Sequence, residues 1–345
     1  MMPVIQINPE DIPKDENLEL RTSSFFQKHK ELPTPDEVRA RARAQYAAGT
    51  HWGWKERSVT SEGYHGCPTP AVFEEMGLFV KWGRLVKLVE GQTLYALQKW
   101  WGKPVPVPEL YGWRTEGDEM FIYMEAIHGR TMEDAWPSLE EEDRIHICSE
   151  LRAILHNLRQ MKLPPNESFV GSVARSKYYE RALFDASQSD SGPFKSVKGF
   201  HDWYIFQYKR WVADPETIPE PYREMLPDDS EIVLTHGDLH QSNIILTLSH
   251  PPRVAALIDW EQSAWLPAYW EDCKAYWTTL YTDEWAAKYL PLIVDHDEDL
   301  VEAWRYYTNP IGVSYTIRHR VCVNFVEISV ALFQRAFHSS SIASL

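Results

Sequence analysis

The hydrophobic positions in the first part of the chain predict strands on either side of one helix. Residues 77–81 (GLFVK) and 120–124 (MFIYM) form short, largely apolar runs, which are typical of buried strands. Between them, residues 89–101 place apolar side chains at steps of three and four, which predicts a helix. Three prolines within 104–108 cannot continue that helix and favour an extended path.

The second part of the chain is predicted to be mainly helical. Residues 140–161 form the longest candidate helix, residues 200–212 form another, and helices return after residue 267. One face of the longest helix is expected to pack on a core. Its predicted apolar stripe consists of Ile145, Leu151, Ile154, Leu155 and Leu158.

Short β runs interrupt these helices between residues 231 and 259. They lie at 232–234, 244–246 and 254–258. Because turn residues at 249–252 separate the last two runs, we predict that these two form a β-hairpin.

Length and pattern together predict two lobes. A chain of 345 residues exceeds the usual size of one compact domain. Near the start, Thr34 is a suitable N-cap and Pro35 a suitable first residue of a helix. We therefore expect an α+β, bilobal fold with an N-terminal extension that carries this helix (1–55), a small β-rich N-lobe (56–127) and a larger, mainly helical C-lobe (128–345).

Composition narrows the class of protein. The formal net charge of −15 argues against a nucleic-acid partner, because phosphate backbones are bound by an excess of Lys and Arg. The four cysteines lack the spacing of a zinc site or a disulfide framework. No run approaches 18 apolar residues, and the first residues lack the features of a signal peptide. We expect a cytoplasmic protein without membrane contact, and a monomer, although the sequence does not fix the oligomeric state.

The candidate chemistry is concentrated in residues 234–261. A His-Gly-Asp tripeptide ends at Asp238, Asn243 follows five positions later, and Asp259 ends the second strand of the predicted hairpin. Phosphoryl transfer with magnesium needs one carboxylate to orient the attacking hydroxyl, and an amide oxygen and another carboxylate to hold the ion. Each residue alone is weak evidence, since Asp and Asn are common in turns. The ordered set between β runs is much more specific.

These motifs support a resemblance to a known family. HGDLHQSNIIL followed by IDWE resembles the signature of the aminoglycoside phosphotransferase and choline kinase families, within the fungal-type phosphotransferase enzyme family. The resemblance covers about residues 77–277 and implies a protein-kinase-like fold. It also implies ATP and Mg²⁺ as cofactors, and transfer of the γ-phosphate to a hydroxyl of a small-molecule acceptor.

The resemblance implies a role for each matching residue of the C-lobe. Asp238 would be the catalytic base, and Asn243 and Asp259 would be the magnesium ligands. His236 would stabilise the catalytic loop; an ordinary buried, hydrogen-bonded histidine is the alternative. We interpret His240 as a loop residue.

In the N-lobe, the resemblance implies a lysine that contacts the nucleotide phosphates. Lys81 lies on the predicted strand 77–81, and Glu90 opens the following helix as its ion-pair partner. Lys87 is a rival for the lysine role. An exposed Lys81 at a strand end is the simpler structural alternative.

The same resemblance implies a hinge that binds adenine after the strand 120–124. Met124, Glu125 and Ile127 would contribute backbone groups there. An ordinary buried strand that runs into a turn predicts nearly the same residues, so these side chains discriminate little.

The chain departs from the family pattern at the phosphate loop. No GxGxxG precedes the strand 77–81, and Gly63, Gly66 and Gly77 are too scattered to form one. A catalytically silent, kinase-like nucleotide-binding or regulatory protein is therefore the alternative to an enzyme. A protein kinase is disfavoured, because HGD and DWE replace HRD and DFG and no APE-like segment follows.

The acceptor is expected to bind next to the helices that follow Asp259. Aromatic and acidic residues are dense there, and together they suit a cationic amine or quaternary ammonium group. We select Trp270, Glu271 and Asp272 as acceptor-side candidates because they lie close after Asp259. The alternative is an acidic solvated face with its aromatic residues packed in the core.

Overall fold

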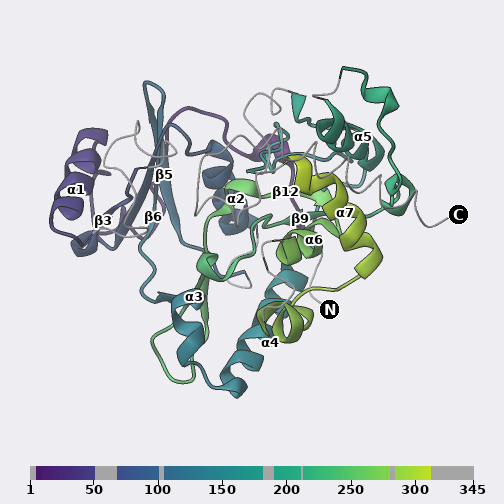
Figure 1. Cartoon of the computed structure of the whole chain (residues 1–345). Helices are drawn as coiled ribbons and strands as arrows, with labels where there is room; N and C mark the ends of the chain where they lie inside the picture. Colours follow the sequence, from purple (N-terminus) through teal and green to yellow (C-terminus); the bar gives the residue numbers. More distant parts are fainter. Residues whose placement is uncertain are drawn as a thin grey trace, which may run out of the picture.

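The computed structural model describes residues 5–50, 68–100, 105–181, 190–210, 213–277, 279 and 284–311. It shows a mixed α and β protein with a sheet-rich N-terminal region and a helical C-terminal region (Figure 1). The predicted α+β fold class is confirmed. Among the residues described, no helix is long and apolar enough to span a bilayer.

The N-terminal region is built on a five-stranded antiparallel sheet with the order β2-β5-β6-β4-β3. The two predicted apolar runs are its central strands, β4 and β6. The strand β5 was not predicted, because a glycine and three polar residues interrupt its apolar pattern. The strands are β2 (Leu18–Glu19), β3 (Ala71–Phe73), β4 (Leu78–Gly83), β5 (Leu110–Glu116) and β6 (Glu119–Glu125).

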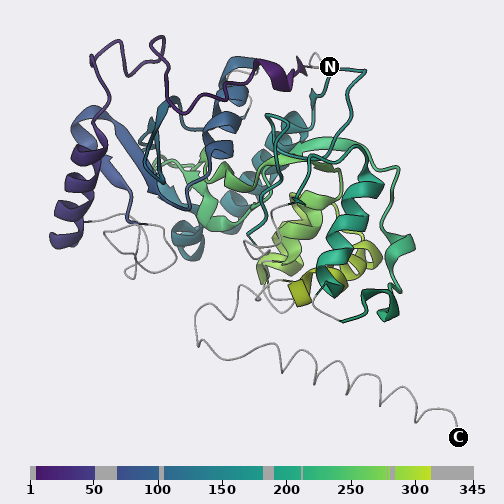
Figure 2. The ribbon, with the colours of Figure 1, turned by 90° about the horizontal axis from the view of Figure 1, so that it is seen from above.

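Helices cover both faces of this sheet. Because side chains alternate along a strand, β6 sends Phe121 and Tyr123 into a cluster with helix α1 (Pro35–Ala47). Its Ile122 and Met124 join the main core, to which helix α2 (Leu88–Trp100) contributes. Figure 2 shows α1 at the outer end of the sheet, away from the C-terminal helices.

The start of α1 follows the sequence prediction. Thr34 and Glu37 form a reciprocal capping box, with Pro35 at the first helical position. Near the other end of the helix, the Gln45 amide donates to the Val72 carbonyl (2.8 Å) and accepts from the Val72 N–H (3.1 Å). Helix α1 thus pairs with backbone groups of β3 at the edge of the sheet.

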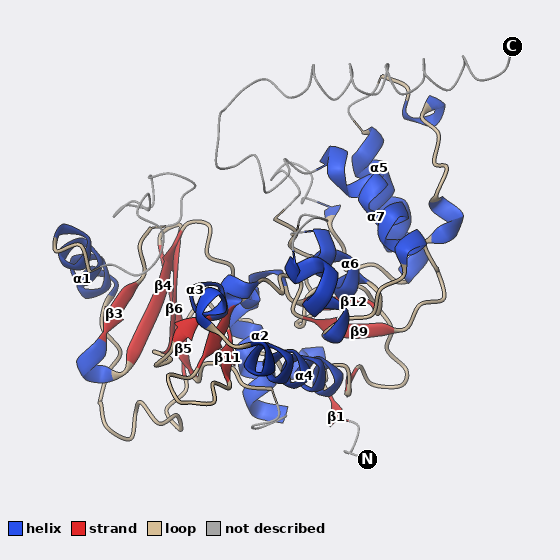
Figure 3. Ribbon diagram, turned by 60° about the horizontal axis from the view of Figure 1, so that its bottom comes forward, coloured by secondary structure: helices blue, strands red, loops and turns tan. Residues whose placement is uncertain are grey.

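The C-terminal region is mainly helical (Figure 3). The predicted stripe of the long helix needs one correction: Ile145 is 46% exposed, and Ile147 is buried instead. Counting back four residues from Leu151 reaches Ile147 on the same face, whereas Ile145 lies off that face. The helices are α3 (Met132–Ala135), α4 (Glu141–Leu158), α5 (Val197–Lys209), α6 (Trp270–Trp277) and α7 (Glu298–Ile311).

Small sheets hold the segment with the candidate chemistry. The predicted hairpin is confirmed as the antiparallel pair β10 and β11, with β7 on the other side of β10. The strand β9 pairs with β12, which was not predicted because it is short and ends in proline; β1 pairs with β8. The strands are β1 (Ile5–Gln6), β7 (Arg130–Thr131), β8 (Met161–Lys162), β9 (Ile232–Thr235), β10 (Ile244–Leu246), β11 (Val254–Leu257) and β12 (Ala264–Pro267).

Candidate active site

The loop between β9 and β10 brings the predicted base next to a predicted metal ligand. The Asn243 side-chain amide donates to the Asp238 carbonyl (2.9 Å) and to Asp238 Oδ2 (3.2 Å). The N–H of Ile258 donates to the Asn243 carbonyl (2.9 Å), which joins the loop to the end of β11. The backbone thereby places Asp259 beside Asp238 and Asn243.

His236 holds this loop from inside. Its side chain is fully buried. Nδ1 accepts from the Asp238 N–H (3.2 Å), so Nε2 carries the proton and donates to the Ile258 carbonyl (2.9 Å). The histidine therefore links the base to the strand that precedes Asp259, and its buried ring offers no surface to a nucleotide.

Gly237 and Glu271 fix the same loop from the other side. Gly237 has φ +80°, and a Cβ there would lie 2.4 Å from the Gln262 carbonyl oxygen, which only glycine avoids. The buried Glu271 carboxylate accepts from the N–H of His236 (2.5 Å) and from the N–H of Gly237 (3.1 Å). Glu271 is thus an anchor of the loop between β9 and β10.

Asp259 ends the hairpin in an unusual backbone conformation. Its φ and ψ are 65° and 58°, in the left-handed region that Asp tolerates better than most residues. Lys81 Nζ lies 2.6 Å from Asp259 Oδ1. Burial alone would raise the pKa of Asp259, yet the charges of Lys81 and Arg181 hold it well below its ordinary value.

Lys81 joins the two regions of the protein. Its ammonium lies 2.7 Å from Glu90 on α2 and 3.3 Å from Glu261, in addition to Asp259. These three carboxylates are close enough together for a metal ion, but the ammonium stands among them. Lys87, the rival, instead lies over the ring of Tyr179, 4.8 Å from its centroid.

The buried charges of this cluster shift the pKa values of Lys81 and Glu90. Burial would lower the pKa of Lys81, but Asp259, Glu90 and Glu261 raise it well above its ordinary value. Burial raises the pKa of Glu90 to about 7, with help from the charges of Asp259 and Glu261 and against the effect of Lys81. The cluster therefore holds a permanently charged lysine against neighbouring carboxylates.

Sequence reasoning missed Arg181 and Glu261. Glu261 is buried and contacts Lys81 with one carboxylate oxygen and Arg181 with the other. Arg181 also lies 3.6 Å from Asp238 and 3.5 Å from Asp259. Glu261 could have been suspected from its place in the Asp-Trp-Glu motif, whereas no motif marks Arg181.

The predicted hinge follows β6. The N–H of Glu125 donates to the Glu109 carbonyl (2.8 Å) and the N–H of Ala126 to the Gly77 carbonyl (3.0 Å). Met124 lies in the strand with its side chain buried. In the described part of the chain, no hydrogen bond reaches the next N–H, that of Ile127. Of the glycines considered for a phosphate loop, Gly63 and Gly66 lie outside the described residues.

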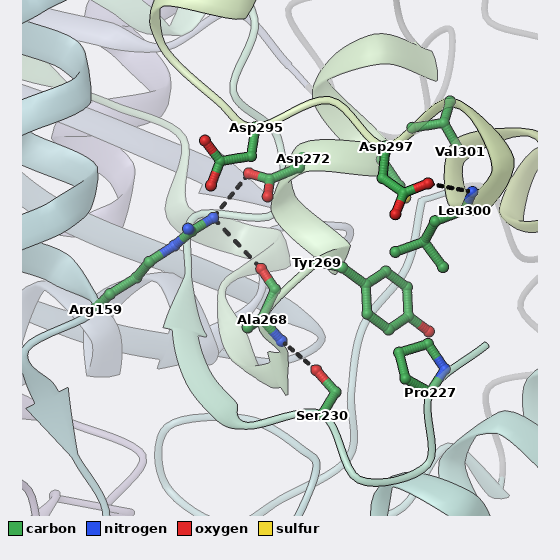
Figure 4. Close-up of a pocket in the computed structure, with 11 residues that line it drawn as sticks. Arg159, Pro227, Ser230, Ala268, Tyr269, Asp272, Asp295, Asp297, Leu300 and Val301 are labelled. Atoms are coloured by element: carbon green, nitrogen blue, oxygen red, sulfur yellow. Dashed lines mark hydrogen bonds and ion pairs between the residues drawn. The ribbon is translucent and has the colours of Figure 1, made fainter. Parts of the chain in front are cut away.

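The acceptor-side candidates occupy three different surroundings. Trp270 is fully buried, where its ring contacts Phe200, and Glu271 anchors the loop between β9 and β10, so neither offers side-chain surface to an acceptor. Asp272 pairs with Arg159 (2.7 Å) at the edge of a cavity of about 290 Å³ (Figure 4). No other predicted site residue lines this cavity among those described.

The dense aromatic residues of this region belong to the core. Trp265, Tyr269, Trp270 and Tyr276 are at most 8% exposed. The acidic side chains of 297–299 are exposed by contrast. The structure therefore favours packed aromatics beneath a solvated acidic face.

The sheet-rich N-terminal region and the helical C-terminal region together form a protein-kinase-like fold. A family model, the phosphotransferase enzyme family, matches residues 91–307, and the chain belongs to this family. These findings confirm the resemblance found in the sequence.

The chain is also similar to solved structures and to a curated relative. The chain has a TM-score of 0.50 and 14% identity to a thermostable mutant of aminoglycoside phosphotransferase APH(4)-Ia in ternary complex with AMP-PNP and hygromycin B, over 78% of this chain and 87% of that one. ADP-bound APH(2'')-Ib has a TM-score of 0.44 and 13% identity over 69% and 77%. Acyl-CoA dehydrogenase family member 11 from Gallus gallus is 30% identical over 171 residues, 47% of this chain; the chain spans about a fifth of that relative, 19% of its length.

Proposed function

We propose that this protein transfers the γ-phosphate of ATP, with Mg²⁺, to a hydroxyl of a small molecule. One observation carries the proposal: Asn243 contacts Asp238 within the loop between β9 and β10, and Asp259 at the end of the hairpin contacts Lys81 from the N-terminal sheet. Phosphoryl transfer depends mainly on positioning and on neutralising charge, and this set of groups is suited to both tasks.

The donor atoms fit a magnesium ion. The side-chain nitrogen of Asn243 donates to Asp238, so the side-chain oxygen of Asn243 points away from that carboxylate. Asp259 supplies a carboxylate whose pKa is lowered. These are hard oxygen ligands of the kind that Mg²⁺ prefers. Asn243 and Asp259 would hold the ion, whose positive charge would offset the negative charge of the nucleotide phosphates.

The remaining groups have complementary roles in the proposal. Asp238 is 6% exposed and would accept the proton of the acceptor hydroxyl while it orients the oxygen for attack. Lys81, positioned by Glu90, would contact the α- and β-phosphates. The N–H of Ile127 would meet adenine at the hinge.

The acceptor class is proposed from chemistry. The described site holds four carboxylates (Glu90, Asp238, Asp259, Glu261) and two cations (Lys81, Arg181), which leaves an excess of between one and two negative charges near pH 7, where Glu90 is partly protonated. Such a site favours an uncharged or cationic acceptor over an anionic one. An amine-bearing alcohol fits this preference, and hygromycin B is bound by one of the structural relatives.

A catalytically silent, nucleotide-binding protein is the second candidate. This candidate is favoured because Lys81 and Arg181 already contact both carboxylate oxygens of Asp259, the oxygens that a metal ion would need. Binding without turnover would be its signature.

The test is transfer of labelled γ-phosphate from ATP to a panel of amine-bearing and neutral alcohols. We expect wild-type turnover with at least one acceptor, and a loss of about 10²–10⁴-fold in Asp238→Asn, the range for a general base. Asp118→Asn removes an exposed carboxylate that pairs with Arg84 and serves as the control. Nucleotide binding without transfer to any acceptor would favour the silent protein, and unchanged turnover in Asp238→Asn would refute the assigned base.

A further inference from the structure

Arg181 lies among the carboxylates of the site. Its Nη1 is 3.6 Å from Asp238 Oδ2, and its Nη2 is 3.5 Å from Asp259 Oδ2. The residue comes from the segment before α5, 78 residues from Asp259 in sequence. The guanidinium therefore bridges the predicted base and a predicted metal ligand.

Among the described residues, Glu261 and Gln262 anchor Arg181 through contacts other than those to the two aspartates. Its Nε donates to Glu261 Oε1 (2.9 Å), and its Nη2 contacts the same oxygen. Its backbone N–H donates to Gln262 Oε1 (3.0 Å), which also accepts from Lys274 (2.9 Å). The anchors fix one edge of the guanidinium, whereas the contacts to Asp238 and Asp259 exceed normal hydrogen-bond length.

The position between the two aspartates has a chemical meaning. In phosphoryl transfer the base contacts the attacking hydroxyl, and the metal ligand holds the ion on the phosphates, so the transferred group passes between them. A planar guanidinium matches the oxygens of a phosphoryl group with two parallel donors. Negative charge that spreads over those oxygens is stabilised by such a fixed cation.

We propose that Arg181 contacts the γ-phosphoryl group of bound ATP, positioned by Glu261, and that in the nucleotide-free protein it neutralises Asp238 and Asp259 instead. This inference rests on the proposed function. On nucleotide binding, the guanidinium keeps Glu261 and exchanges its long contacts with the aspartates for phosphoryl oxygens. The same carboxylates then become available to the metal ion and the acceptor hydroxyl.

The test compares nucleotides that differ only in the γ-phosphate. Dissociation constants for ATP and ADP, each with Mg²⁺, are measured by calorimetry on wild type, Arg181→Ala and Arg181→Lys. A lost charge-assisted hydrogen bond corresponds to about 10- to 100-fold in affinity. We expect Arg181→Ala to lose at least about tenfold for ATP, and markedly less for ADP. Arg181→Lys should recover part of the difference.

Controls distinguish loss of the contact between Arg181 and the γ-phosphoryl group from unfolding and from the loss of one positive charge elsewhere on the protein. Arg152→Ala removes an exposed arginine that pairs with Asp295, and should leave the ATP/ADP ratio unchanged. Circular dichroism and melting temperature show whether each variant folds, and Glu261→Gln, which weakens the anchor, should lower the ATP/ADP preference in the same direction. Equal loss for both nucleotides, or tighter ATP binding in Arg181→Ala, would overturn the proposal while leaving the proposed function intact. No nucleotide binding by wild type would instead contradict the proposed function.

Discussion

Glu271 offers the sharpest test of how the loop between β9 and β10 is held. Its carboxylate is 2% exposed and accepts from the N–H groups of His236 and Gly237. Hydrogen bonds to a charged group contribute about 1.5–3 kcal/mol each. Glu271→Ala removes the acceptor of both N–H groups and should lower the free energy of unfolding by about 3–6 kcal/mol on that basis. Glu271→Gln keeps one acceptor oxygen and should lose roughly half as much.

The assay is equilibrium unfolding in urea, followed by tryptophan fluorescence. Because domains are stable by only about 5–15 kcal/mol, the Gln variant is the safer choice for a full titration. Glu302→Ala, on the exposed face of α7, is the control and should change stability by less than about 0.5 kcal/mol. An Ala variant within about 1 kcal/mol of wild type would refute the reasoning, since the two N–H groups could then not depend on this carboxylate.

Two further predictions follow from the same region. Gly237→Ala forces φ +80° on an alanine whose Cβ would lie 2.4 Å from the Gln262 carbonyl oxygen. We expect the free energy of unfolding to fall by about 1–3 kcal/mol, measured as a lower melting temperature, and an unchanged melting temperature would contradict the strain. Burial raises the pKa of Asp272 to about 7; the charge of Arg159 lowers it, and the charges of Glu271 and Asp295 raise it further. An unfolded Asp titrates at about 3.9, so the native state holds the extra proton between the two values, and the contribution of Asp272 to stability should be lost as pH rises from about 4 to 7. Asp272→Asn should lack this contribution in urea unfolding at pH 5 and 8, and an unaltered pH dependence would contradict the raised pKa.

The sequence predicts those parts of the fold that depend on local pattern. The apolar runs of β4 and β6 and the capping residue Thr34 appear where expected, because each is decided by neighbours in sequence. The strand β5 was missed because a glycine interrupts its short apolar run and polar residues follow it, and pairing with β6 decides its conformation. Ile145 was misplaced because a stripe chosen by residue type ignored the helical angle.

In the candidate site, too, the sequence predicts the residues of one local motif and misses contacts between distant segments. Asp238, Asn243 and Asp259 lie within one short segment, so their order could be read directly. Arg181 reaches Asp259 across 78 residues and Glu271 reaches Gly237 across 34, contacts that only tertiary structure creates. For that reason Glu271 was interpreted as an acceptor-side residue, although the structure uses it to anchor the loop.

The central claim is that Asp259 holds a magnesium ion on a bound nucleotide. The most direct measurement is a thermal-shift titration with ATP, with and without Mg²⁺, on wild type and Asp259→Asn, with Asp118→Asn as the control. At a hundredfold excess over the dissociation constant, a ligand that binds only the native state adds about 2.7 kcal/mol of stability. The account predicts a magnesium-dependent rise in melting temperature that is lost in Asp259→Asn alone. The same magnesium-dependent rise in Asp259→Asn, or no rise in wild type, would contradict it.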